Sequence, residues 1–199
     1  MKRRDVRNRL IERTIQNIAE NGLEKTTTKS IVQGTEINEA YIYSNFTDKD
    51  DLISHSFDVL DDELVTVLTE NMAVMYMRQL DFEIRCRVFF TSVWNYLVGN
   101  REKCLAFVRY YYSPYFLKYS VNTHKKRFEP IVETFRKVFI EEADVWMILN
   151  HILNVMLDFA VMVHNDRMPE DDDYSEHVFR VIYRSIEQYF KKEEVAVNV

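Results

Sequence analysis

The sequence predicts an all-α protein of about nine helices. Apolar residues recur at a spacing near 3.6 along most of the chain, which is the period of an amphipathic helix. Only 3 glycines and 3 prolines occur in 199 residues, too few for the turns that a sheet of several strands needs. A hydrophobic content of 47% is enough for a sizeable buried core.

Residues 2–21 are predicted to form the first helix. Ile11, Ile15 and Ile18 lie on one stripe of that helix, so we expect them to face the core. Gly22 follows at the position where a left-handed residue often ends a helix.

Residues 26–49 predict two short helices separated by a tight corner. Thr27 and Thr28 are suited to cap the first of them, because a threonine oxygen there accepts a backbone N–H that has no partner within the helix. Asn38 repeats this pattern at the start of the second helix. Two caps this close along the chain indicate a helix-turn-helix unit.

The later part of the chain predicts longer helices. Acidic residues at 48, 50 and 51 mark the start of a fourth helix that runs toward Glu70, since the positive end of a helix dipole favours carboxylates. Pro114 is expected to break or kink a later helix after Ser113. The remaining helices are predicted over residues 80–98, 104–119, 122–139, 143–164 and 174–192.

A set of residues near the amino terminus matches a known pattern. It consists of the run YSNFTDKDDL together with Ile18, Ala19, Gly22, Thr26, Thr27, Ile31, Ile37 and Ile42. With these residues, the stretch 13–52 resembles the amino-terminal domain of the TetR/AcrR family of bacterial transcription regulators. The resemblance implies a three-helix DNA-binding domain at residues 1–50 and a helical domain for ligand binding and dimerisation at residues 51–199.

Two residues depart from the family's pattern. Glu36 stands at the corner where the family usually has a glycine, often with a positive φ that costs another residue about 1 kcal/mol. Glu39 stands where the family often has a basic residue, and a carboxylate repels phosphates unless it accepts a hydrogen bond from a cytosine amino group. Glu39 is therefore either a specificity residue or is turned to solvent.

The formal charge of −6 is unevenly distributed along the chain. Residues 1–29 contain eight Lys or Arg and four Asp or Glu, a local charge of +4, so the rest of the chain carries −10. This asymmetry fits a basic amino-terminal part that meets phosphates and an acidic body that stays in solvent. The alternative interpretation is a basic solubilising tail.

The resemblance assigns roles to side chains in the helix-turn-helix unit. Hydroxyl and lysine groups would hold phosphates, and asparagine suits adenine because it donates and accepts hydrogen bonds at once. Tyr43 could instead pack with its hydroxyl in water, and Lys49 could pair with a neighbouring carboxylate on the surface. The predicted DNA-binding residues are Thr27, Thr28, Lys29, Asn38, Glu39, Tyr41, Tyr43, Asn45 and Lys49.

The helix over residues 145–163 is apolar on nearly every side, so it must be buried on nearly every side. A twin subunit could cover one side in a two-fold four-helix bundle with the last helix, or the helix could be the core of a monomer. Dimeric DNA reading, with recognition helices about 34 to 36 Å apart, favours the dimer. The predicted interface residues are Leu149, Ile152, Met156, Phe159, Val163, Val178, Ile182, Ile186 and Tyr189.

Aromatic residues are concentrated in the middle of the chain. Buried tyrosines need partners for their hydroxyls, so such a group suits a cavity with a few polar groups, although each residue alone fits ordinary core packing. The family resemblance favours an effector cavity for a ligand of apolar, aromatic or cationic character. The predicted pocket residues are Phe89, Phe90, Trp94, Phe107, Tyr110, Tyr111, Tyr115, Phe116, Tyr119 and Phe128.

No pattern typical of a metal site or a catalytic centre occurs in the sequence. The histidines lack HExxH spacing, and neither a CxxC pair, a glycine-rich phosphate loop nor a GxSxG motif is found. We therefore expect no metal, no cofactor and no enzymatic activity. Two cysteines, no secretory h-region and no run of about 18 uninterrupted apolar residues predict a cytoplasmic protein with no membrane partner.

Together these observations predict a TetR-like repressor. It would be a homodimer that binds a near-palindromic operator in double-stranded DNA and is released by a small-molecule effector. The alternative is a DNA-binding-deficient TetR-like protein that acts as a co-regulator through protein–protein contacts, since Glu36 and Glu39 would weaken DNA binding. A helical enzyme is a third interpretation, but no set of acid, base or nucleophile supports it.

Overall fold

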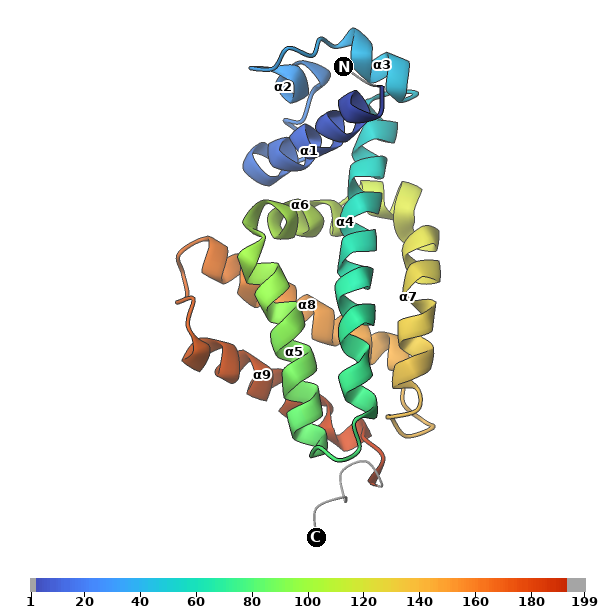
Figure 1. Ribbon diagram of the computed structural model, residues 1–199, viewed down its shortest axis with the longest axis vertical. Coiled ribbons are helices and arrows are strands. Elements are labelled where there is room, and N and C mark those ends of the chain that lie inside the picture. Colours follow the sequence, from blue (N-terminus) through green and yellow to red (C-terminus); the bar gives the residue numbers. More distant parts are fainter. Residues whose placement is uncertain (1–2, 193–199) are drawn as a thin grey trace. The chain divides into compact units, whose positions relative to one another are not determined.

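Nine α-helices run through residues 3–192, the part of the chain that the computed structural model describes (Figure 1). They are α1 (Arg3–Asn21), α2 (Thr28–Val32), α3 (Ala40–Asn45), α4 (Lys49–Asn71), α5 (Phe82–Gly99), α6 (Arg101–Tyr111), α7 (Val121–Phe135), α8 (Val145–His164) and α9 (Asp172–Ile186). Three short helical turns are also present: the 3₁₀ turns η1 (Met72–Tyr76) and η3 (Glu187–Tyr189), and the π-helical turn η2 (Phe116–Ser120). The all-α fold class predicted from the sequence is confirmed.

Three of the predicted helices end early in the structure, and one of them, predicted over residues 122–139, ends at Phe135. The stretch 104–119 divides at Pro114, because α6 ends at Tyr111 and η2 then runs directly into α7. The last helix ends at Ile186, where the backbone turns to pair with another segment. The Tyr189 carbonyl, in η3, accepts from the Ile140 N–H at 2.8 Å, and the Lys191 N–H donates to the Val138 carbonyl at 3.0 Å.

The described residues form two compact units. Unit 1 combines residues 3–63 with residues 100–125, and unit 2 combines residues 64–99 with residues 126–192. The chain therefore passes from one unit to the other within α4, between α5 and α6, and within α7. The domain boundary predicted after residue 50 concerns function, and it stays a prediction.

The interior of unit 1 joins α1, α4 and α6. α1 packs against α2, α3 and α6. Phe57 of α4 stacks on Tyr110 of α6 with ring centroids 4.3 Å apart. The Tyr110 hydroxyl lies 2.8 Å from the Ser120 hydroxyl, and the buried side chains of Asp61 and His124 approach to 2.7 Å. The polar groups in this aromatic core are thus bonded to one another.

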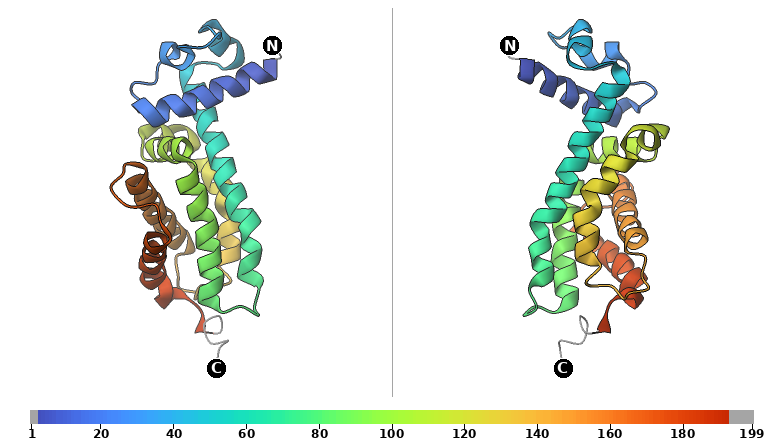
Figure 2. Two further views of the ribbon diagram at one scale, coloured as in Figure 1. Left: turned by 60° about the vertical axis from the view of Figure 1, so that its left-hand side comes forward. Right: turned by 90° about the vertical axis from the view of Figure 1, so that its right-hand side faces the viewer.

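Unit 2 is built around α5, α8 and α9, which pack against one another (Figure 1 and Figure 2). Both tryptophans of the chain belong to it. Trp94 stacks on Phe90 at 5.8 Å, and Trp146 meets Phe128 edge to face at 6.3 Å. An ion pair between Arg87 and Glu176 joins α5 to α9.

α8 is the one helix in residues 3–192 that is long and apolar enough to cross a membrane by length and composition. Asp144 caps it by accepting a hydrogen bond from the Met147 N–H at 2.9 Å. Its most apolar window has a mean hydropathy of 1.6, yet only 33% of that window is buried. Part of the apolar surface of α8 is therefore not covered within one chain.

Candidate functional site

The short helix α2 begins with a reciprocal cap. The Thr27 hydroxyl oxygen accepts from the Ser30 N–H at 3.1 Å, while the Ser30 hydroxyl oxygen accepts from the Thr27 N–H at 2.9 Å. This pair satisfies two backbone donors that a five-residue helix would otherwise leave without partners. The capping role predicted for Thr27 is confirmed.

The corner between α2 and α3 obtains its left-handed residue from a glycine. Gly34 has a φ of +74°, and Asp166 is the only non-glycine residue with a positive φ in the described part of the chain. The expectation that Glu36 strains the corner is therefore wrong, because Gly34 makes the turn two positions earlier. Arg13 holds the corner to α1 by donating to the Gln33 carbonyl at 3.0 Å.

The side chains at the start and along the outside of α3 are exposed. The Asn38 side-chain oxygen accepts from the Ala40 N–H at 3.1 Å, but the N-cap of α3 is Glu39, whose side chain makes no capping hydrogen bond, so Asn38 stabilises the turn that precedes the helix rather than capping it. Tyr41 and Tyr43 are 44% and 61% exposed. We call Asn38, Glu39, Tyr41 and Tyr43 the α3 face.

Ile37, Ile42 and Phe46 are buried on the other side of this segment, which explains why the α3 face points outward. α3 packs against α1, and the Arg7 guanidinium lies 4.9 Å from the Phe46 ring centre. Asn45 is half-buried, and its amide nitrogen donates to the Tyr41 carbonyl at 2.8 Å. Its donor group is thus already engaged within α3.

Glu39 is exposed to solvent, as one of its two predicted interpretations required. Its carboxylate accepts a hydrogen bond from the Thr28 hydroxyl at 2.5 Å. The two short helices are therefore joined by a contact that uses one predicted phosphate-binding hydroxyl. Lys29, next to it in α2, is exposed.

The first turn of α4 lies in unit 1, as α2 and α3 do. Thr47 N–H donates to Asp51 at 2.8 Å and Asp51 N–H donates to Asp48 at 2.8 Å, so carboxylates cap this helix. The Lys49 ammonium donates to the Thr26 carbonyl at 3.4 Å rather than pairing with a neighbouring carboxylate. Lys49 thus lies beside the start of α2.

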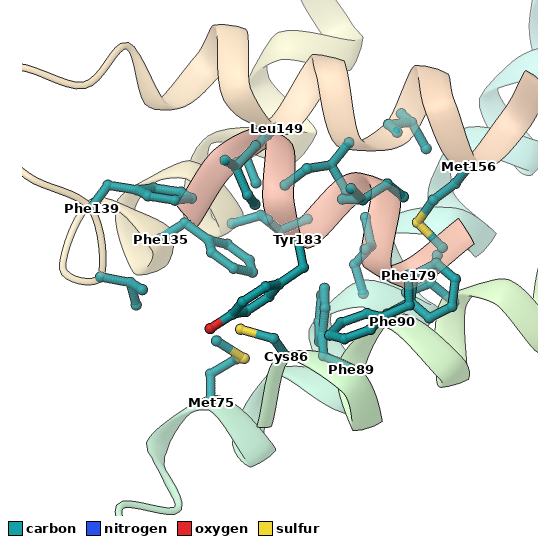
Figure 3. Close-up of a pocket in the computed structure, with 18 of the residues that line it drawn as sticks. Met75, Cys86, Phe89, Phe90, Phe135, Phe139, Leu149, Met156, Phe179 and Tyr183 are labelled. Atoms are coloured by element: carbon teal, nitrogen blue, oxygen red, sulfur yellow. The ribbon is translucent and has the colours of Figure 1, made fainter. Parts of the chain in front are cut away.

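Unit 2 contains a cavity of ≈ 90 Å³ (Figure 3). Its walls come from α5, α8, α9, η1 and the ends of α4 and α7. Among 21 lining residues, the only polar groups are the Cys86 thiol and the Tyr183 hydroxyl. Burial raises the pKa of Tyr183 to about 12, so the hydroxyl is neutral at physiological pH.

The structure divides the ten aromatic residues that were predicted to share one pocket. Phe89, Phe90 and Phe128 line the cavity, and Trp94 stacks on Phe90 without lining it. The other six belong to unit 1: Phe107, Tyr110, Tyr111, Tyr115, Phe116 and Tyr119. The prediction grouped these side chains by their nearness in sequence, whereas α5 and α6 belong to different units.

The unit 1 aromatics have two structural roles. Phe107, Tyr110 and Phe116 pack around Phe57 of α4, with ring centroids 4.3 to 5.6 Å away. Tyr111 packs on Phe116 at 4.6 Å. The remaining pair holds the start of α4, since Tyr115 and Tyr119 hydroxyls donate to the Asp50 carboxylate at 3.0 and 3.1 Å.

The residues predicted at a dimer interface are mostly turned into their own unit. Those that are buried are Met156, Val163, Val178, Ile182 and Ile186. Leu149 and Ile152 line the cavity together with three of these, while Phe159 and Tyr189 are half-buried. The apolar residues that α8 and α9 expose are instead Met147, 55% exposed, and Val181, 54% exposed.

The family of the amino-terminal part follows from a sequence match. Residues 10–55 match the sequence model of the family described as "Bacterial regulatory proteins, tetR family". These residues belong to the TetR family. They contain α2, the corner at Gly34, α3 and the capped start of α4, so the TetR resemblance predicted from the sequence is confirmed over this segment.

Solved TetR-family structures have the same fold over most of the chain. A TetR family transcription regulator from Marinobacter aquaeolei VT8 superposes with a TM-score of 0.76 at 14% identity, covering 93% of this chain and 98% of that chain. A tetR family regulator from Shewanella sp. PV-4 gives 0.74 at 13% identity, covering 90% and 97%.

A third similar structure is described by its regulatory role. The fatty acid degradation regulator FadR from Bacillus halodurans superposes with a TM-score of 0.67 at 15% identity, covering 89% of this chain and 94% of that chain. No curated protein matches the chain by sequence. At these identities the structural likeness establishes the TetR fold, including its helix-turn-helix domain.

Sequence reasoning missed two polar groups of the cavity in this TetR-like fold. Cys86 was considered only for disulfide and metal chemistry. Tyr183 lies next to Ile182 on the apolar stripe of α9, and a tyrosine at the edge of such a stripe is the signal that could have identified it. Gly34 was also missed, although a glycine between two short helices marks a left-handed turn.

Proposed function

We propose that this protein is a ligand-responsive transcriptional repressor that binds double-stranded DNA through the α3 face. The observation that carries the proposal is that residues 10–55, which match the TetR family, present this face to solvent. Asn38 and Tyr41 would read base edges, while Tyr43, Lys49 and Thr27 would contact phosphates and fix the register.

The geometry refines the roles of three other predicted residues. Lys29 is exposed beside the α2 cap and adds a cation for phosphates. Asn45 supports α3 from within, because its amide already donates to a backbone carbonyl. Glu39 positions Thr28 and keeps a carboxylate on the α3 face, so it would select against phosphate and favour a cytosine amino group.

We propose that two copies associate through the outer sides of α8 and α9. These sides expose Met147 and Val181, and the His151 ring lies 2.9 Å from the Ser185 hydroxyl across the two helices. Only 33% of the apolar window of α8 is buried, and the apolar surface that remains exposed supports a partner on this side. A two-fold dimer would read a near-palindromic operator, and a DNA regulator of this kind would act in the cytoplasm.

We further propose that the cavity of unit 2 binds a small effector that releases the DNA. The ligand need only bind one conformation of the dimer better than the other. A differential affinity of about 1 to 3 kcal/mol changes operator occupancy about 5- to 150-fold.

An electrophoretic mobility shift assay on DNA upstream of the protein's own gene tests DNA binding. We expect sequence-selective binding that weakens from 50 to 200 mM salt, conditions over which phosphate contacts lose much of their affinity. Tyr43→Ala and Lys49→Ala should each weaken binding about three- to tenfold. The matched controls are Tyr112→Ala and Lys118→Ala, exposed residues of unit 1 outside the helix-turn-helix.

The same assay distinguishes the repressor from the co-regulator alternative. That alternative is favoured by the exposed Glu36 and Glu39, which place two carboxylates in the segment meant to meet DNA. Absence of binding to any promoter DNA, at both salt concentrations and with folded protein, would support the co-regulator and overturn the repressor.

A further inference from the structure

The cavity of unit 2 has no charged residue in its wall. Its two polar groups lie close together, because the Tyr183 hydroxyl points toward Cys86 and Met75 (Figure 3). The rest of the wall consists of Leu, Ile, Val, Met and Phe side chains. A ligand therefore meets one polar corner and an otherwise apolar surface.

The Tyr183 hydroxyl is the strongest hydrogen-bonding group in this corner. It makes no hydrogen bond to any of the residues 3–192, although its ring packs on Phe179 at 5.5 Å and on Phe190 at 5.4 Å. Tyr183 is half-buried, and its ring holds the hydroxyl at the polar corner, so the hydroxyl can donate to an acceptor that a ligand brings there.

The surroundings of the corner disfavour an anionic ligand. Burial raises the pKa of Tyr183 to about 12, and the carboxylates of Glu83 and Asp81 act in the same direction. A negative potential that opposes a tyrosinate also opposes a ligand carboxylate. Neither nearby arginine lines the cavity: Arg87 is bound by Glu83 and Glu176, and the buried Arg85 donates to the Met75 carbonyl at 2.7 Å.

A cationic ligand is disfavoured for a different reason. No carboxylate reaches the cavity wall, so a buried ammonium group would lose its hydration without gaining an ion pair. Attraction to the faces of phenylalanine rings is weaker than that lost hydration. The cationic option considered from the aromatic content of the sequence is thus not supported by the wall.

We propose that the cavity binds a neutral, slender, apolar molecule with one terminal hydrogen-bond acceptor, such as a ketone or an ester, which the Tyr183 hydroxyl recognises. This inference rests on the proposed effector role of the cavity. A cavity of ≈ 90 Å³ has room for about six to nine water-sized groups, at about 10–15 Å³ for each. A seven-carbon methyl ketone is of this size.

Calorimetric titration of the full chain without DNA tests the proposal. The probes are 2-heptanone, heptanoate and heptylammonium at pH 7, which share a chain length and differ in charge. We expect 2-heptanone to bind at least tenfold more tightly than either ion. Equal or tighter binding of heptanoate or heptylammonium, or no binding of any probe, overturns the inference.

Removing the Tyr183 hydroxyl separates the contribution of its hydrogen bond from that of ring packing. Tyr183→Phe keeps the ring and should weaken 2-heptanone binding about three- to tenfold, the range for one neutral hydrogen bond. Tyr174→Phe removes a hydroxyl from the same helix outside the cavity and should leave affinity unchanged. An unchanged affinity in Tyr183→Phe contradicts the assigned role.

Infrared spectroscopy of the bound ketone gives a second readout. The carbonyl stretch should move to lower frequency in the native protein and in Tyr174→Phe, but not in Tyr183→Phe. A carbonyl stretch that is the same in all three proteins contradicts the hydrogen bond. None of these measurements involves DNA, so their failure leaves the mobility shift assay as an independent test of the repressor.

Discussion

The Arg109 guanidinium donates a hydrogen bond of 2.7 Å to the carbonyl oxygen of Ile18. The same nitrogen donates to the Ala19 carbonyl, also at 2.7 Å. Both carbonyls lie in the last turn of α1, which has no basic residue of its own there. Since the carboxyl end of a helix attracts cations, α6 supplies the charge that α1 lacks.

Arg109→Ala should lower the free energy of unfolding by about 1 kcal/mol, because it removes a charged donor from partly exposed carbonyls. Urea unfolding followed by circular dichroism measures this effect. Arg184→Ala is the control, since its carboxylate partner Glu187 is three residues away on an exposed surface. Equal effects of the two substitutions would show that Arg109 does not support α1.

Gly34→Ala should destabilise the protein by about 1 kcal/mol. The φ of +74° is unfavourable for a residue with a Cβ, although no atom lies within 4 Å of the added carbon. Gly99→Ala is the control, because a Cβ added at Gly99 also has no atom within 4 Å but Gly99 has no positive φ. This substitution should be neutral or slightly stabilising. Thermal unfolding of both variants distinguishes backbone conformation from steric fit.

His124→Ala should be among the most destabilising single substitutions in unit 1, by about 2 to 4 kcal/mol. The Asp61 carboxylate, fully buried, would lose a partner at 2.7 Å, and a buried charge without its partner is costly. His177→Ala, at an exposed site on α9, should change stability by less than about 0.5 kcal/mol. A small effect of His124→Ala would mean that other groups already satisfy Asp61.

Stability should fall as the pH rises above about 9. Burial raises the pKa of Cys104 from 9.0 to about 12 in the folded protein. Between these values the unfolded chain has lost the thiol proton and the folded chain keeps it, so rising pH favours unfolding. We expect Cys104 to lower the free energy of unfolding by about 1 kcal/mol between pH 8 and pH 10, and the tyrosines whose pKa burial also raises, such as Tyr183 and Tyr115, to add to this fall.

Denaturant titrations of variants at these two pH values check the cause. Cys104→Ala should reduce the difference in unfolding free energy between pH 8 and pH 10 by about 1 kcal/mol. The comparison uses the pH dependence of each variant, so any cavity that Cys104→Ala creates cancels. A Cys104→Ala protein with the native pH dependence would assign the effect to other groups.

Much of the helix-turn-helix could be predicted because its determinants are local. A cap depends on a side chain and a backbone N–H two or three residues away, so the cap at Thr27 could be identified from sequence alone. The corner was predicted less well. Glu36 stands where the family usually has a glycine, whereas Gly34, the residue with the positive φ, carried the local signal for the turn.

The cavity could not be predicted in the same way. Periodicity indicates which side of a helix is buried but not which helix covers it, so Phe89 and Phe107 were assigned to one pocket although they belong to different units. Met156 and Ile182 were likewise recognised as apolar, but their burial inside the chain, rather than against a partner, depends on the tertiary packing of α8 and α9.

The placement of Trp94 and Trp146, both in unit 2, determines what optical experiments on this protein report. Tryptophan fluorescence will report changes around the cavity of unit 2 and will change little when the helix-turn-helix unfolds. Fluorescence and circular dichroism recorded on one sample can therefore resolve the two units without any label.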